Sequence, residues 1–152
     1  MRIDELQLVC QEAAEQVVSR GRRPLPATIV LPLPAVTRVV ELVDFPDDDG
    51  GRELLLTRLA EQELVPANAA AYGFVAEGLA ADEGGAPMEV VVVVYSARGH
   101  HPWVTAAALE GDGVGPFAEP EPLAPSAMPF LAPVQRAVDS ARPPDVMLGG
   151  QG

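Results

Sequence analysis

The segment 96–105, SARGHHPWVT, contains both histidines and the single tryptophan of the chain. His100 and His101 beside Arg98 are the residues best suited to catalysis or ligand binding, because an imidazole acts as a general base near neutral pH once a carboxylate orients it. The same stretch also fits the loop of a hairpin, with Gly99 supplying the turn. We favour the loop, because the sequence identifies no carboxylate that would complete a catalytic site.

Strand geometry disfavours a metal ion at the two histidines. Successive side chains of a strand point to opposite faces, so a regular strand would not direct His100 and His101 toward one ion. A zinc site also needs a third and usually a fourth ligand, and the spacing of the acidic residues does not indicate which of them would serve. We therefore expect no metal ion and no cofactor.

The acidic run 44–49, DFPDDD, is a second candidate for a metal site. In a calcium loop aligned on the first glycine that follows, the first and last ligand positions would be Phe45 and Leu56, whose side chains have no oxygen. We therefore interpret the run as the turn before a helix, with Asp48 or Asp49 as the N-cap.

Other motifs of enzyme chemistry are missing from the sequence. All ten basic residues are arginine, which removes Schiff-base and Walker-type lysine chemistry. The glycines of 111–115 precede Pro116, where a dinucleotide-binding loop needs its third glycine. Cys10, the only cysteine, lies on the apolar stripe of a predicted helix and is interpreted as a buried structural residue. These features favour a protein without enzymatic activity.

The charge and hydropathy of the chain restrict its partners. Its 152 residues carry a formal net charge of −12, which disfavours a nucleic-acid-binding surface, since such surfaces are built from cationic contacts. The longest strongly apolar run, VVVVVY, is too short to cross a bilayer, and the amino-terminal residues lack the pattern of a signal peptide. We expect a cytoplasmic, bacterial-type protein from a GC-rich genome, with neither nucleic acid nor a membrane among its partners.

Hydrophobic periodicity predicts the elements of the first half of the chain. Residues 3–19 have apolar side chains at helical spacing and predict an amphipathic helix, with a capping box that starts at Asp4. β-Branched residues then predict a short strand near 27–31 and a longer one near 36–44. The leucines of 51–64 predict a short second helix.

The stretch 71–110 predicts three strands joined by tight turns, which form an antiparallel meander. Val90–Val94 are apolar on both faces, so their strand belongs in the middle of the sheet, covered above and below. The whole pattern predicts an α+β fold in the order α-β-β-α-β-β-β-α, in which helices flank an antiparallel sheet of about five strands.

Proline content divides the chain into two parts. We predict a single α+β domain over 1–115 and a proline-rich segment over 116–152. The segment contains a short helix marked by Phe130, Val134 and Val138, and its end is expected to fray. Its apolar residues favour packing on the domain, and docking on a partner is the alternative.

The scarcity of catalytic groups, the hydrophobic sheet and the proline-rich segment together favour a non-enzymatic protein-interaction module: an adaptor, a regulator or a chaperone-like protein. Its partner would be another protein or a second copy of itself. The interaction residues that we expect are Phe117, Leu123, Met128 and Phe130. The alternative is a small enzyme or ligand-binding domain whose site is the loop with Arg98 and the two histidines.

Overall fold

The computed structural model describes residues 1–143. Helices and strands follow one another along this part of the chain in the predicted order. The helical elements are α1 (Ile3–Ser19), α2 (Asp49–Leu59), η1 (Ala60–Leu64), α3 (Val65–Ala67), η2 (Pro129–Leu131) and α4 (Ala132–Asp139). The strands are β1 (Thr28–Pro32), β2 (Thr37–Glu41), β3 (Ala71–Ala81), β4 (Pro87–Ala97), β5 (Trp103–Glu110), β6 (Gly113–Val114) and β7 (Glu121–Pro122).

The described strands form one antiparallel sheet in the order β2-β1-β3-β4-β5-β6, and β7 also pairs with β5. This arrangement confirms the predicted α+β class and the meander β3-β4-β5. The sheet has seven strands instead of about five. The difference comes from β6 and β7, which have two residues each and are too short to show a periodic pattern in the sequence.

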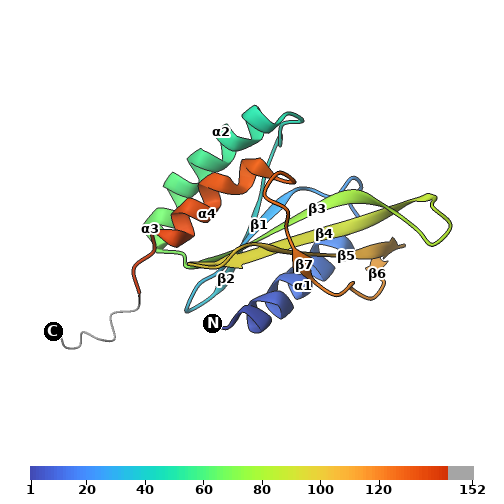
Figure 1. Cartoon of the computed structure of the whole chain (residues 1–152), viewed down its shortest axis with the longest axis horizontal. Helices are drawn as coiled ribbons and strands as arrows, with labels where there is room; N and C mark the ends of the chain where they lie inside the picture. The colour runs from blue at the N-terminus through green and yellow to red at the C-terminus, as the bar shows by residue number, and fades with distance from the viewer. Residues whose placement is uncertain (144–152) are drawn as a thin grey trace.

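Helices cover both faces of this sheet (Figure 1). The helix α1 lies on one face, while α2, η2 and α4 pack together on the other. We call these the α1 face and the α2/α4 face. The central strand β4 contributes to both cores, because Val91 and Val93 are buried on the α1 face and Val94 is buried on the α2/α4 face. This double burial explains the uninterrupted valine run.

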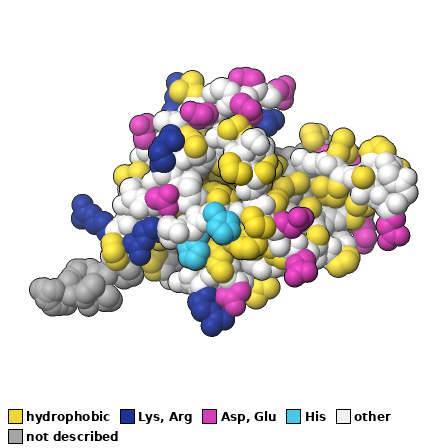
Figure 2. All heavy atoms as spheres, in the orientation of Figure 1, with side chains coloured by type: hydrophobic (Ala, Val, Ile, Leu, Met, Phe, Trp, Pro, Cys, Tyr) yellow, Lys and Arg dark blue, Asp and Glu magenta, His cyan; other side chains and the backbone are white. Residues whose placement is uncertain are grey.

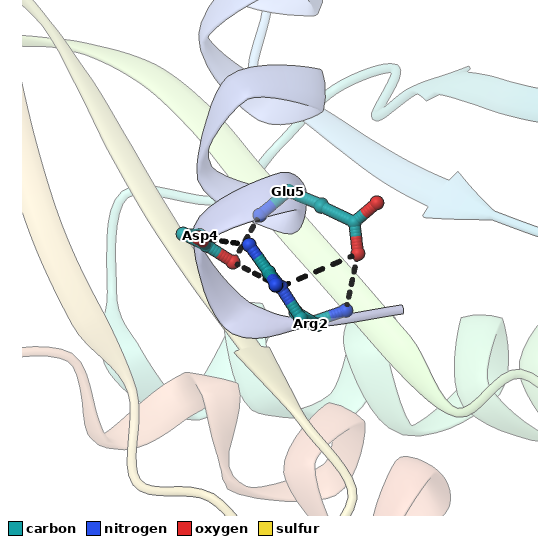
Figure 3. A network of polar contacts seen from close by, with 3 residues as sticks. All are labelled: Arg2, Asp4 and Glu5. Atoms are coloured by element: carbon teal, nitrogen blue, oxygen red, sulfur yellow. Dashed lines mark hydrogen bonds and ion pairs between the residues drawn. The ribbon is translucent and has the colours of Figure 1, made fainter.

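The first turn of α1 corrects the predicted capping box at Asp4. Arg2 is the N-cap residue, and its backbone N–H donates to the Glu5 carboxylate at 2.9 Å (Figure 3). The guanidinium of Arg2 donates to the Asp4 carboxylate at 2.8 Å, and this hydrogen bond lowers the pKa of Asp4. A capping box needs its acidic side chain three residues after the N-cap, and Glu5 meets that condition once the helix starts at Ile3.

The second predicted helix begins slightly earlier than expected. Asp48 is the N-cap of α2 and accepts a hydrogen bond from the Gly51 backbone N–H at 2.7 Å, in agreement with the predicted cap. The helical path continues through η1 and α3 and ends at Asn68, whose φ of 53° is left-handed. The preceding strand β2 is shorter than the predicted 36–44: it ends at Glu41, and Val43 and Asp44 form a turn in which Asp44 has a φ of 55°.

The proline-rich segment runs back along the outer edge of β5, and we call residues 115–123 the strap. The Ala118 backbone N–H donates to the Ala106 carbonyl at 2.9 Å, and the Leu123 N–H donates to the Pro102 carbonyl at 2.9 Å. Three prolines in the strap have no N–H group, so the strap offers a poor template for a further strand.

The predicted short helix corresponds to η2 and α4, in which Phe130, Val134 and Val138 are buried. The frayed end that we predicted falls mainly on residues 144–152, which lie outside the described residues. Between residues 1 and 143, no helix is both long enough and apolar enough to cross a membrane.

Candidate functional site

The histidine stretch forms the loop between β4 and β5, as the sequence predicts. Gly99 adopts a φ of 76°, and Tyr95 lies opposite Trp103 at the end of the hairpin. The ring of His101 lies against the ring of Trp103, with 5.0 Å between the centroids. Both imidazoles are exposed, and Figure 2 shows them at the surface.

Helix α4 and the residues after it hold this loop in place. The Gly99 backbone N–H donates to a carboxylate oxygen of Asp139 at 2.9 Å, and the Arg98 guanidinium donates to the Ala141 carbonyl at 3.0 Å. The Gln135 amide donates to the same Asp139 oxygen at 3.0 Å and to the His100 carbonyl at 3.3 Å. Arg98 therefore anchors the loop to the carboxyl-terminal part of the fold.

Within residues 1–143, the hydrogen bonds of the loop do not involve either imidazole ring. Asp139 is the carboxylate that reaches the loop, and it accepts from Gly99 and Gln135 instead of orienting an imidazole. The Ser96 hydroxyl donates to the backbone carbonyl of His100 at 3.0 Å and not to a ring nitrogen of that residue. Among the described residues, no three His, Cys, Asp or Glu side chains lie close enough to hold a metal ion.

The four residues predicted to bind a partner pack against the two cores and differ in how deeply they are buried. Phe117 packs on the α1-face core, while Leu123 and Met128 pack on the α2/α4-face core. Phe130 is fully part of that second core, with 4% of its surface exposed. Met128 and Phe130 also line an open hollow, so part of the predicted set borders a surface that a partner can reach.

This hollow is on the α2/α4 face, where the helix layer leaves the sheet uncovered. It has a volume of about 490 Å³ and lies between the start of α2, the chain before η2 and the β3–β4 hairpin. We call it the apolar hollow; the residues that define it here are Phe45, Arg52, Phe74, Gly78, Val92 and Phe130. Figure 2 shows hydrophobic side chains gathered over the sheet beside the helices.

Aromatic rings and one guanidinium form a wall of the apolar hollow. The centroids of Phe45, Phe74 and Phe130 lie 5.7 to 5.9 Å apart, in tilted and edge-on arrangements. The Arg52 guanidinium lies 4.9 Å from the centroid of Phe45 and 5.3 Å from that of Phe130. Its Nε donates to the Pro46 carbonyl at 2.6 Å, so both the rings and the backbone fix its position.

Small side chains of β3 keep the floor of the hollow open. Ala76 and Gly78 lie opposite Val92 and Val90 of β4, and all four are on the α2/α4 face. A Cβ atom at position 78 would lie 2.9 Å from a methyl group of Val92. Glycine is therefore required at this position if the floor is to stay flat.

Carboxylates border the apolar hollow. Asp47 and Asp49 are exposed at its mouth, and Glu77 is half-buried, with its carboxylate accepting the Leu25 backbone N–H at 3.0 Å. The two aspartates at the mouth thus outnumber the single guanidinium among the lining residues, that of Arg52. The mouth of the hollow carries net negative charge, as does the chain as a whole.

Sequence reasoning missed this hollow because its parts are far apart along the chain. Phe45 precedes α2, Phe74 is in β3 and Phe130 is in η2. The available signals were the phenylalanine next to the acidic run and the small residues within the β3 sequence AYGFVAEGLA. Neither signal indicates which faces will meet in the fold.

Comparisons with protein-family models, with curated proteins and with solved structures find no match for this chain.

Proposed function

We propose that this protein is a non-enzymatic interaction module that binds an apolar, basic segment of a partner protein in the apolar hollow. The observation that carries the proposal is an aromatic-walled hollow of about 490 Å³ that stays open beside the helix layer. Concave, mostly apolar surfaces with a few fixed polar groups are the usual form of a binding site.

The walls favour an apolar anchor. Phe45 and Met128 are half-buried and present apolar surface to the cavity, over a floor made by Ala76 and Val92. A leucine or phenylalanine side chain of a partner would fill this space and bury apolar surface on both molecules. Such anchors, seated in pockets, supply most of the binding energy of an interface.

The charges favour a basic partner. Asp47 and Asp49 stand at the mouth, where an arginine or lysine next to the anchor would meet them. The net charge of −12 adds a long-range attraction for cationic segments and disfavours acidic ones. Arg52 is held on two phenylalanine rings, so its charge is directed at the wall more than at the mouth.

Binding of short labelled peptides to the full chain, measured by fluorescence anisotropy, tests this proposal. We expect a peptide of alternating leucine and lysine to bind, and the matched peptide with glutamate in place of lysine not to bind. Ala76→Leu fills the floor and should weaken binding of the first peptide at least about tenfold. Ala81→Leu, on the exposed end of the same strand, is the matched control and should leave binding unchanged.

The charge at the mouth is tested separately. Replacing Asp47 and Asp49 by asparagine keeps the Asp48 cap and should weaken the lysine peptide several-fold, with the difference disappearing at high salt. If the leucine–lysine peptide binds wild type and Ala76→Leu with the same affinity, the proposal is contradicted. Binding of both peptides with the same affinity would contradict its charge requirement.

A further inference from the structure

The two outer edges of the sheet differ. The strap follows the edge of β5, whereas no segment of residues 1–143 pairs with the outer edge of β2. An open edge presents unpaired backbone N–H and C=O groups, which can pair with a strand from another chain. The edge of β2 is therefore where this sheet can be extended.

The hydrogen bonds to β1 establish which backbone groups of β2 face outward. The Leu42 N–H donates to the Ala27 carbonyl at 2.8 Å, one step beyond the pair Thr28–Glu41. Along an antiparallel strand, residues whose N–H and C=O groups point to one neighbour alternate with residues whose groups point the other way. The backbone groups of Arg38 and Val40 therefore also point toward β1. The N–H and C=O groups of Thr37, Val39 and Glu41 consequently point away from the sheet.

Exposed valines follow this same edge. Val36 is 58% exposed, Val39 is 40% exposed and Val43 is 70% exposed. A groove of about 520 Å³ runs beside the edge on the α2/α4 face, where Val40 and Leu54 are among its lining residues. A run of exposed apolar side chains next to unpaired backbone groups is unusual for an edge that stays free in solution.

The charged side chains of β2 are already paired within the chain. Arg38 forms an ion pair with Glu63, and Glu41 forms one with Arg22. The edge is thus locally neutral in a chain whose net charge is −12. Another copy can approach this edge without bringing two unpaired like charges together.

We propose that two copies of this chain form a symmetric dimer through antiparallel pairing of their β2 edges, with Val39 at the two-fold axis. In this register Val39 of one copy lies opposite Val39 of the second copy, and Thr37 lies opposite Glu41 of the second copy. All the outward backbone groups of Thr37, Val39 and Glu41 are then paired. The result is one continuous sheet that spans both copies.

Symmetry and charge select this register. A two-fold axis that joins two antiparallel edges is perpendicular to the sheet, so each face continues into the same face of the second copy. Centring the pair on Arg38 or on Glu41 would place like charges directly opposite each other. A pair centred on Val40 would leave the outward N–H and C=O groups of Thr37 without partners in the second copy.

The register centred on Val39 also keeps like charges apart. Arg38 of one copy lies opposite Val40 of the second copy, and Glu41 lies opposite Thr37, so neither charge meets its own counterpart.

Sedimentation analysis of the full chain as a function of concentration is the first test. We expect a monomer–dimer equilibrium in the wild type. Val39→Pro removes an outward N–H from each copy but none of the hydrogen bonds to β1, so it should weaken dimerisation at least about tenfold. Val39→Thr keeps the N–H group and the β-propensity and should retain the dimer, which distinguishes edge pairing from a loss of folding.

Cross-linking with a short bifunctional maleimide tests the register. Val39→Cys should be captured as a covalent dimer, because the two cysteines would be directly opposite each other. Leu79→Cys is the control: Leu79 is more exposed than Val39, at 74% against 40%, but lies in the β3–β4 hairpin, so this variant should stay monomeric. The native Cys10 is fully buried and should not react.

A wild type that sediments as a monomer at every concentration would overturn the dimer. A dimer that Val39→Pro does not weaken, or equal cross-linking of both cysteine variants, would overturn the β2 interface. These results do not depend on the apolar hollow, and Ala76→Leu should leave the dimer unchanged.

Discussion

The Sγ atom of Cys10 lies so close to Gly73 that a Cβ atom at position 73 would be 2.5 Å from the sulfur. Gly73 is in β3, directly beneath α1, and the Cβ of Val30 would be 3.3 Å away on the neighbouring strand. Glycine at this position therefore determines how closely α1 approaches the sheet. This contact sets the thickness of the α1-face core.

Gly73→Ala should destabilise the fold by about 1–3 kcal/mol, because the added methyl group has no space unless α1 moves away from the sheet. Urea unfolding followed by circular dichroism measures the change. The double variant Cys10→Ala/Gly73→Ala should recover part of the loss, since it removes the sulfur that the methyl group meets. If the losses in the free energy of unfolding of the two single variants add up to that of the double variant, the close contact is not the cause of the destabilisation.

The Cys10 thiol should resist labelling in the native state. Burial raises its pKa to about 12, so the reactive thiolate is scarce at neutral pH and the sulfur is inaccessible. Labelling with a thiol reagent should follow the urea unfolding curve. Fast labelling of the native protein would contradict the burial of α1 against β3.

The same thiol predicts how stability depends on pH. The unfolded chain loses this proton near the ordinary pKa of 9.0, while the native state keeps it up to about pH 12. The unfolded state then binds fewer protons, so the free energy of unfolding should fall as pH rises through this range. Cys10→Ala should show a shallower decrease; burial also raises the pKa of Tyr72 and Tyr95, so some decrease should remain.

Arg52→Met should destabilise the protein by about 1–2 kcal/mol. The substitution keeps an unbranched apolar stem but removes the cation above Phe45 and Phe130 and the hydrogen bond to the Pro46 carbonyl. Thermal unfolding measures the effect. Arg58→Met, further along the same helix and exposed, is the matched control and should change stability by less than about 0.5 kcal/mol.

In the β4–β5 loop, the carboxylate of Asp139 anchors the backbone, whereas the two imidazoles are exposed. Asp139→Ala should cost about 1 kcal/mol, because it removes an acceptor from the Gly99 N–H and from Gln135. His100→Ala combined with His101→Ala should leave stability within about 0.5 kcal/mol of wild type. A larger loss in the histidine variant than in Asp139→Ala would show that the imidazoles support the fold.

Deletion of residues 116–152 should yield an aggregating protein. The deletion uncovers the edge of β5 and removes the buried side chains of Phe130, Leu131, Val134 and Val138. Size-exclusion chromatography of the truncated chain measures the outcome. A monodisperse, folded product would mean that the segment is a peripheral arm.

Several elements were predictable because their signals are local. The helical spacing in 3–19 and the valine run of β4 reflect the periods of a helix and of a strand buried on both sides. The cap of α2 could be narrowed to Asp48 or Asp49 because aspartate is favoured before a helix, and the structure selects Asp48. The capping box of α1 was placed two residues too late, since the pairs Asp4–Gln7 and Arg2–Glu5 both have the required spacing and only the backbone path selects between them.

The sequence by itself determined the class of the fold, the order of its elements and the fact that both faces of the sheet are covered. Tertiary structure alone decided the apolar hollow, the path of the strap and the open edge of β2. Each of these depends on which distant segments meet: Phe45 with Phe74 and Phe130, Ala118 with Ala106, and β2 with no described strand beyond it. Local periodicity carries no information on such pairings, because the side chains that create them are selected by packing in three dimensions.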